Sequence, residues 1–133
     1  MIEIIVVIGI LALILGTGSI VMFDAIGRSV AINEQNIVVT LLMGQRTKAL
    51  SNLNQRSHGL MVEANQYTLF EGVSFAAGTN KRAVAKGAGV TTGGNTEFVF
   101  GQLSGTSTSA SMTITDGAKV ATIDINAEGR IEW

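Results

Sequence analysis

An apolar run at the start of the chain limits the folds open to it more than any other feature. Residues 2–23 are apolar or small, apart from one carboxylate, Glu3. About 20 apolar residues in a helix span the ~30 Å hydrocarbon core of a bilayer. A charge placed at bilayer depth costs roughly 2.5–3.5 kcal/mol on insertion scales, so such residues are usually paired and functional. The run therefore predicts a membrane-spanning helix in which Glu3 has a specific partner.

Two other interpretations of this run are open. In an ordinary signal anchor, Glu3 would sit in the headgroup zone and need no partner. A secretory signal peptide is disfavoured, because no basic segment precedes the run and because the run exceeds the usual 7–15 apolar residues.

The first 16 residues, MIEIIVVIGILALILG, resemble the N-terminus of type IV pilins and pseudopilins. Mature chains of that family begin with an apolar helix that carries one Glu near the amine. The resemblance implies that Glu3 pairs with the N-terminal amine of a neighbouring subunit, here that of Met1, during filament assembly. It also implies insertion into the inner membrane before assembly, and dependence on a prepilin peptidase and an assembly machinery.

The chain departs from the family pattern at several points. The family Glu is the fifth mature residue whereas Glu3 is the third, so we expect either two residues before Met1 or different processing. The basic leader that precedes the family's cleavage site is absent, which indicates a mature or truncated chain. The sequence has no Cys for the C-terminal disulfide of many pilins, and no Pro for the hydrophobic helix.

The apolar run contains one weakly helical stretch, formed by Gly16, Thr17, Gly18 and Ser19. Each Gly costs roughly 1 kcal/mol of helix propensity relative to Ala. Small residues of this kind allow close packing between membrane helices. The family resemblance implies a second interpretation, a segment that melts in the filament near the position of the missing Pro. Melting would require other partners for the freed backbone groups.

Residues 24–57 continue the helix with an amphipathic pattern. Apolar pairs at i, i+4 spacing, such as Ile26 and Val30 or Ile37 and Leu41, predict a helix to about Leu53. The apolar stripe is broad, so we expect one face to pack on a globular domain and another on neighbouring helices. A helix of this length measures roughly 80 Å at 1.5 Å per residue and must project beyond one bilayer.

Residues 58–133 read as a β domain. Strand patterns occur at residues 59–63, 66–70, 96–100, 112–115, 120–125 and 130–133, with hairpin turns at Ala64-Asn65 and Asp116-Gly117. Residues 71–95 have weak periodicity and are interpreted as a surface loop with a short strand at 82–86. The predicted fold class is α+β: a long N-terminal helix whose second half packs on one small antiparallel sheet of about four to seven strands.

The second half has a resemblance of its own. The pattern FVFGQLSG…MTIT…VATIDINAEGRI is similar to the C-terminal half of the H-type minor pseudopilins of type II secretion and of related minor pilins. This resemblance implies a minor subunit. The Ser- and Thr-rich residues 101–111 fit either a flexible tip or an O-glycan carrier on a surface coat.

The composition gives no support to catalysis. Without Cys there is no disulfide, thiol nucleophile or thiolate metal site. The single His, His58, has no catalytic partner pattern and is interpreted as a surface or turn residue. Four carboxylates are close in sequence but lack EF-hand spacing, so solvated side chains are favoured over a calcium site: Asp116, Asp124, Glu128 and Glu132. We therefore expect no enzyme, no cofactor and no metal site.

Charge argues against nucleic acid as a main partner. The net charge is −1, whereas binding to phosphates requires a basic patch. Candidates for a weak DNA or surface contact are Lys81, Arg82 and Lys86, which are balanced by acidic residues.

The sequence thus predicts three parts: a membrane-spanning or filament-core helix at 1–23, its amphipathic continuation at 24–57, and a β domain at 58–133. The predicted function is that of a structural subunit that polymerises, as a homo-oligomer, into a type IV pilus-like filament at the cell surface. The alternative is a minor pilin, a pseudopilin or a membrane-anchored accessory module in secretion or DNA uptake.

Overall fold

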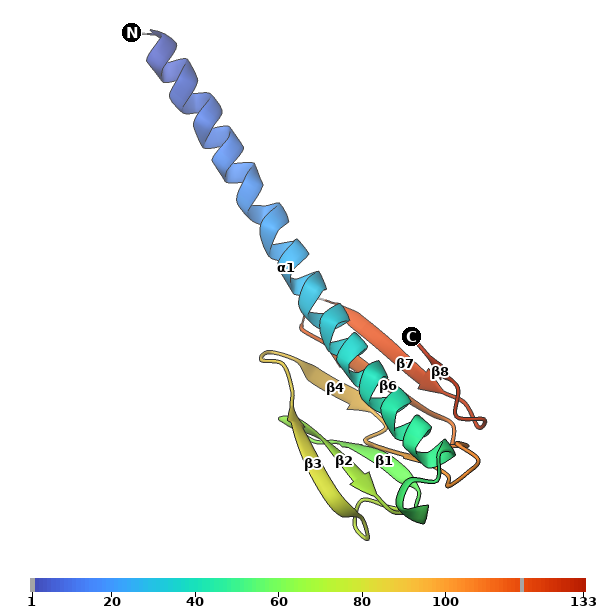
Figure 1. Ribbon diagram of the computed structural model, residues 1–133. Helices are drawn as coiled ribbons and strands as arrows, with labels where there is room; N and C mark the ends of the chain where they lie inside the picture. Colours follow the sequence, from blue (N-terminus) through green and yellow to red (C-terminus); the bar gives the residue numbers. More distant parts are fainter. Residues whose placement is uncertain (1, 118) are drawn as a thin grey trace.

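The computed structural model is dominated by one long helix that projects from a β domain (Figure 1). The structure describes the backbone of residues 2–117 and 119–133, and the side chains of residues 3–13, 30–117 and 119–133. Helix α1 runs over Ile2–Leu50, and its first turn contains Glu3. Its N-terminal part stands clear of the β domain, whereas its C-terminal part lies against the sheets (Figure 1).

Helix α1 ends at a polar segment, three residues before the expected Leu53. Asn52 takes up the left-handed conformation with φ 55°, which Asn tolerates better than most residues. A single 3-10 turn, η1 (Leu53–Gln55), follows and leads into the first strand. The backbone amide of Leu103 donates to the carbonyl oxygen of Ala49 at 2.9 Å, so a distant loop closes the end of the helix.

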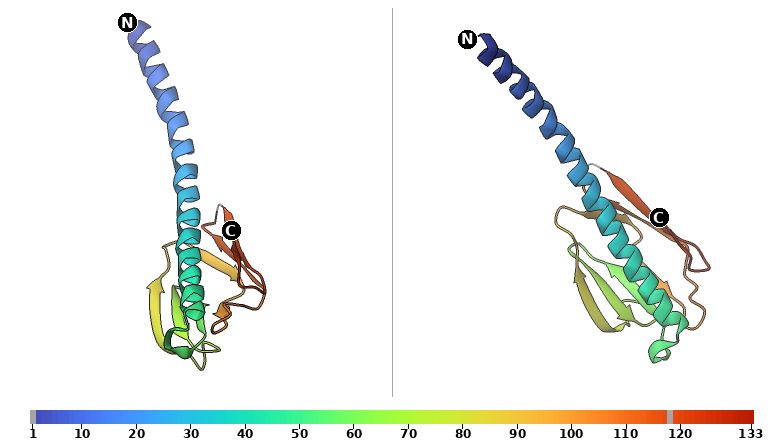
Figure 2. Two further views of the ribbon diagram at one scale, coloured as in Figure 1. Left: turned by 45° about the vertical axis from the view of Figure 1, so that its right-hand side comes forward. Right: turned by 45° about the horizontal axis from the view of Figure 1, so that its top comes forward.

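In the part of the chain that the structure describes, eight strands form two antiparallel sheets, and the inner face of α1 packs against both of them (Figure 2). The first sheet has the order β3-β2-β1-β5, with β1 (His58–Val62), β2 (Gln66–Glu71), β3 (Thr79–Ala85) and β5 (Glu97–Phe100). The second sheet has the order β4-β6-β7-β8, with β4 (Thr91–Gly94), β6 (Ala110–Thr115), β7 (Val120–Ile125) and β8 (Ile131–Glu132).

The predicted fold class is therefore wrong: the chain forms two four-stranded sheets, not one small sheet under a long helix. The additional strands β3 and β4 both lie in residues 71–95, which were predicted to be mainly loop. Six of the seven residues of β3 are exposed, and β4 has the sequence TTGG. A strand with solvent on both faces has no alternation of apolar and polar residues, so it leaves no period-two signal.

The two predicted hairpins are confirmed. Strands β1 and β2 pair across residues 63–65, from Val62 opposite Tyr67 to His58 opposite Glu71. Strands β6 and β7 pair across Asp116-Gly117, from Thr115 opposite Val120 to Ala110 opposite Ile125. Gly117 has φ 91°, a value that favours glycine, which explains why this turn could be recognised from the sequence.

The core lies between the inner face of α1 and the two sheets. On the helix, Ala31, Val38, Leu42 and Ala49 are at most 2% exposed, and their spacings of four or seven residues place them on one face. The sheets contribute Leu60, Tyr67, Phe98, Phe100, Met112, Ile114, Ile123 and Ile125. Burying a large apolar side chain contributes about 1.5–3 kcal/mol, so this layer holds the second half of α1 in place.

Candidate assembly surface

The first part of α1 presents apolar side chains to solvent on every side. Eight large side chains in residues 3–13 are between 52% and 70% exposed: Ile4, Ile5, Val6, Val7, Ile8, Ile10, Leu11 and Leu13. Residues 4–8 are consecutive and so cover a full helical turn of 3.6 residues. Monomeric soluble proteins rarely expose contiguous apolar surface beyond a few hundred Å², so a surface of this kind marks an interaction with protein or membrane. We call residues 3–13 the apolar rod.

Glu3 carries the only charge of the apolar rod. Its side chain is exposed in the first turn of α1, where the positive end of the helix dipole favours a carboxylate. The amine that the family resemblance assigns to it belongs to Met1, which lies outside the described residues. The pairing of Glu3 therefore stays a prediction.

Two other predictions concern the same helix. In the described part of the chain, no helix has a stretch long and apolar enough to cross a membrane. Residues 14–23 of the predicted span fall outside the described side chains. So does the candidate melting segment, Gly16, Thr17, Gly18 and Ser19.

Apolar side chains also remain uncovered along the second half of α1. Val30 and Ile37 flank the buried face on one side, and Ile32, Met43 and Leu50 flank it on the other, each 37–45% exposed. The second flank borders a hollow between Ile32 and Val120, and another between Met43 and Ile131. The uncovered surface of the helix therefore extends beyond the apolar rod into the β domain.

The structure does not bring the three predicted basic contact residues together as one patch. Lys81 and Arg82 are neighbours in β3, so their side chains leave opposite faces of that strand. Lys86 is hydrogen-bonded within the domain, because its Nζ donates to the Glu63 carbonyl oxygen at 2.8 Å and to Thr92 Oγ1 at 2.9 Å. Burial lowers the pKa of the Lys86 ammonium, although the carboxylate of Glu34 opposes that shift.

Glu34 is the main polar residue that the sequence interpretation missed. It is only 4% exposed, and its Oε1 accepts a hydrogen bond from the backbone amide of Gly87 at 3.1 Å. Burial raises the pKa of the nearby Tyr67 hydroxyl, and Glu34 raises it further, although the two groups lie outside good hydrogen-bond geometry. Glu34 thus ties the loop after β3 to the helix. Glu34 follows Ala31 by three residues and precedes Val38 by four, and this helical spacing could have placed it on the buried face.

His58 was predicted at a surface or turn, and that prediction is wrong. It is the first residue of β1 and only 1% exposed, with its Nε2 3.0 Å from the carbonyl oxygen of Leu53. Its role in the structure is to join the end of η1 to the first sheet.

The four carboxylates near the C-terminus do not gather into one site. Asp116 lies in the β6–β7 turn, whereas Asp124 lies at the other end of β7, opposite Glu132 in β8. Among the described side chains, those of residues 3–13, 30–117 and 119–133, no three His, Asp or Glu side chains are placed to hold a metal ion. Arg130 Nε contacts Glu132 Oε1 at 3.2 Å, with both side chains more than half exposed.

Comparisons of the chain with models of known protein families, with curated proteins and with solved structures yield no match. Its function therefore has to be inferred from the residues and their arrangement.

Proposed function

We propose that this chain is a structural subunit that polymerises through its N-terminal helix into a type IV pilus-like surface filament. The observation that carries the proposal is the apolar rod, whose large side chains are all at least 52% exposed. In the same helix, the inner face of residues 31–49 is fully covered by the chain's own sheets. Exposure of these apolar side chains to water is unfavourable in free energy, so the apolar rod needs a partner outside the chain.

The partner of the apolar rod changes during the life of the subunit. Before assembly, lipid covers it in the inner membrane. After assembly, the rods of other copies cover it, and van der Waals packing between rods replaces contact with lipid tails, which are as apolar as the side chains themselves. Contacts between unlike surfaces of identical chains propagate into open helical arrays when the rotation does not close, and such an array is a filament.

Glu3 gives this association its register. A carboxylate buried among apolar rods is costly unless a cation pairs with it, and removal of one partner of a buried pair costs about 3–5 kcal/mol. Apolar contacts alone are non-directional and would allow neighbouring rods to slide. A single charge near the end of each rod selects the arrangement in which it meets the amine of the next subunit.

A second candidate is a minor pilin, a pseudopilin or an anchored accessory module. It is favoured by the resemblance of residues 98–131 to H-type minor pseudopilins. A minor subunit has the same rod but enters the filament at low abundance, whereas an anchored module acts as a monomer or tip complex. The minor subunit therefore differs from the main subunit in stoichiometry, and the anchored module differs in not forming the filament.

Electron microscopy of material sheared from cells that make this chain tests the proposal. We expect filaments a few nanometres wide in which mass spectrometry finds this chain as the dominant species. Filaments with only traces of it would assign the minor role. A complete absence of filaments, with the chain confined to the membrane fraction, would contradict polymerisation.

The variant Glu3→Ala tests the role of the carboxylate. We expect normal membrane insertion and few or no filaments, while Glu3→Asp, which keeps the charge, should retain part of the assembly. Filaments of normal yield from Glu3→Ala would contradict the function assigned to Glu3.

A further inference from the structure

One of the two edge strands of the first sheet, β3, carries exposed basic side chains on both of its faces. Lys81 and Arg82 are neighbours in β3 and leave opposite faces, so both border its free edge. Arg56 lies at its beginning, because Arg56 Nη1 donates to Thr79 Oγ1 at 3.1 Å. Lys81 Nζ lies 4.0 Å from the centre of the Phe75 ring, which holds the ammonium at the surface. We call Arg56, Lys81 and Arg82 the basic edge.

The acidic residues behind the basic edge are engaged in other contacts. Glu71 accepts hydrogen bonds from Asn54 Nδ2 at 2.9 Å and from Asn80 Nδ2 at 2.8 Å. Glu63 Oε2 accepts from Gln66 and Thr68. Among the side chains that the structure describes, the one ion pair within 4.0 Å is Arg130 with Glu132, at the other side of the domain. The charges of Arg56 and Lys81 still reach Glu71 and Glu63 at longer range, but no described carboxylate lies within 4.0 Å of the basic edge to form an ion pair.

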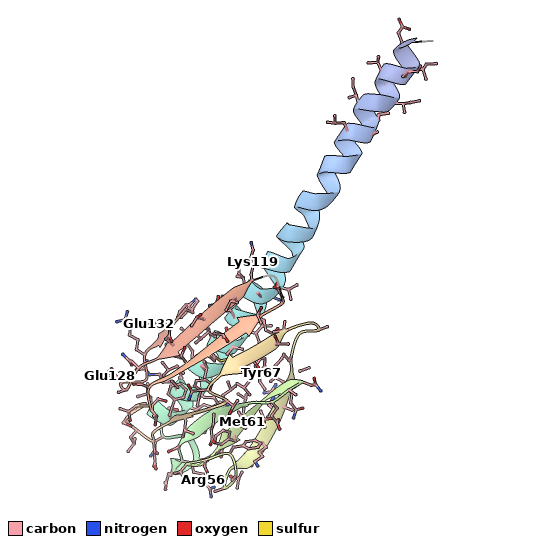
Figure 3. All side chains as sticks on the ribbon, turned by 180° about the vertical axis from the view of Figure 1, so that it is seen from behind. Arg56, Met61, Tyr67, Lys119, Glu128 and Glu132 are labelled. Atoms are coloured by element: carbon pink, nitrogen blue, oxygen red, sulfur yellow. The ribbon has the colours of Figure 1, made fainter. Side chains whose placement is uncertain are left out.

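A surface of opposite sign lies at the end of the second sheet. Asp124 and Glu132 are directly opposite each other in β7 and β8, and both are exposed. Like charges in this position destabilise a strand pair. Glu128, in the connecting turn, lies on the same side of the domain as Glu132 (Figure 3). Arg130 pairs with Glu132, and Arg46 Nη2 donates to the Glu128 carbonyl oxygen at 3.3 Å. We call Asp124, Glu128 and Glu132 the acidic surface.

These two surfaces lie on opposite sides of the domain. In all ribbon views, β3 lies to one side of α1 and the β7–β8 end of the second sheet lies to the other (Figures 1 and 2). A copy that binds one neighbour through its basic edge keeps its acidic surface free for another. Such a contact is heterologous and propagates from copy to copy.

We propose that the basic edge of one copy binds the acidic surface of a second copy, side by side around the filament. This inference rests on the proposed function, because it assumes that rods hold the copies together. The rods supply most of the affinity, since exposed ion pairs are individually weak. The domain charges supply orientation, because complementary charge contributes more to specificity than to affinity.

Cross-linking in the full chain tests this contact directly. The sequence has no Cys, so Ala83→Cys in β3 together with Thr122→Cys in β7 introduces the only thiols and keeps all six charges. A disulfide requires Cα atoms within about 7 Å, and the two positions lie on opposite sides of one copy, so it can form only between copies. In oxidised filaments we expect a ladder of dimers, trimers and longer species.

The control pair is Thr108→Cys with Thr122→Cys, because Thr108 is exposed but lies outside both charged surfaces. It should give no ladder. Filaments without a ladder from the test pair, or with an equal ladder from the control, would overturn the contact and leave the proposed function standing. An absence of filaments from the wild-type chain would overturn the proposed function instead.

A charge swap tests the electrostatic basis. We expect Arg82→Glu or Asp124→Arg alone to lower the ladder yield about two- to fivefold, as exposed pairs allow, and the two together to restore it. Lys48→Glu is the matched control, since Lys48 is exposed on α1 and belongs to neither surface. Failure of the double variant to recover would contradict a direct pairing of the two surfaces.

Nucleic acid is the other partner that a basic edge could serve. A double-stranded DNA fragment distinguishes the two, in a retention assay on wild-type and Arg82→Glu filaments. Retention by the wild type that is lost in Arg82→Glu and at high salt, without any ladder, would replace the contact between copies with a DNA site. A ladder without retention supports the contact between copies.

Discussion

The two halves of helix α1 have the same secondary structure but opposite relations to solvent. Leu42, in the second half, is 0% exposed, whereas Leu11, in the apolar rod, is 52% exposed. Both residues are leucines in the same helix, so neither the residue type nor the secondary structure explains why only Leu42 is buried. What differs is the partner: the chain provides two sheets for the second half and none for the rod.

The halves also differ in how precisely a partner can be positioned. The buried face of the second half contains polar residues that fix the helix on the sheets. Gln45 Nε2 donates to the Gly59 carbonyl oxygen at 2.8 Å, and Glu34 accepts from Gly87. In the apolar rod, the only group of this kind is Glu3. The domain half is therefore held in one position by several directional contacts, whereas the rod depends on one.

The largest effect should come from the same substitution made in each half. Leu42→Ala removes a fully buried side chain, and we expect the free energy of unfolding of the domain to fall by about 2–5 kcal/mol. Leu11→Ala should change that free energy by less than about 0.5 kcal/mol but should reduce filament yield. Urea unfolding in detergent, followed by circular dichroism, measures the first quantity. Equal losses of domain stability would show that the halves are not independent.

The next largest effect should come from substitution of the carboxylates Glu34 and Glu3, one in each half of the helix. Glu34→Gln weakens a charge-assisted hydrogen bond to the Gly87 amide, and we expect a loss of about 1.5–3 kcal/mol in domain stability. Glu3→Gln should leave domain stability unchanged and affect only assembly. The same unfolding experiment, combined with counts of filaments by electron microscopy, separates the two. A stable domain in Glu34→Gln would mean that the buried carboxylate is dispensable.

Glycine substitutions should have opposite effects on stability in the β domain and in the apolar rod. An alanine Cβ at Gly129 would collide with the carbonyl oxygen of Gly105, and φ there is 74°. Strain of this kind costs about 1–3 kcal/mol, so Gly129→Ala should lower the melting temperature. Gly9→Ala meets nothing within 4 Å and should stabilise the helix by about 0.5–1 kcal/mol. Thermal unfolding and helix content at residue 9 by hydrogen exchange report the two effects.

A fall in pH should have the smallest effect, and it should lower the stability of the β domain alone. Hydrogen bonds from Thr68 and Gln66 lower the pKa of Glu63 below its ordinary value of 4.5. At Glu71, burial pushes the pKa upward, but hydrogen bonds from Asn80 and Asn54 and the charges of His58 and Arg56 lower it overall. A lowered pKa in the folded state means stability that is present above pH 4.5 and is lost as pH falls further.

Thr68→Val provides the measurement for this effect. It removes the hydroxyl that donates to Glu63 Oε2. The decline in stability between about pH 5 and pH 3 should become shallower in this variant. An unchanged decline would assign the acid sensitivity to other carboxylates.

Sequence patterns predicted the parts of the fold that have a strong local signal. The alternation around Ile123 and Ile125 corresponds to a buried face. The apolar spacing on α1 predicted the helix, but Val30 and Ile37 of the predicted pairs are 37% exposed and flank the face that is buried. The same reasoning missed β4 and predicted only the last part of β3, as a short strand at 82–86, because strands that are held by backbone pairing and exposed to solvent have no periodic pattern. It also missed the burial of Glu34 and His58, because each depends on a backbone partner that a local apolar pattern does not reveal: Gly87 for Glu34 and Leu53 for His58.

The pairing of distant segments has a consequence for the order in which the chain can fold. Helix α1 ends at Leu50 but contacts β7 and β8, which begin only at Val120 and Ile131. During synthesis, the inner face of the helix therefore stays uncovered until these later strands have emerged. Such non-local pairing slows folding and leaves apolar surface open to aggregation. Early capture of the rod by lipid would keep nascent copies apart until each domain has closed.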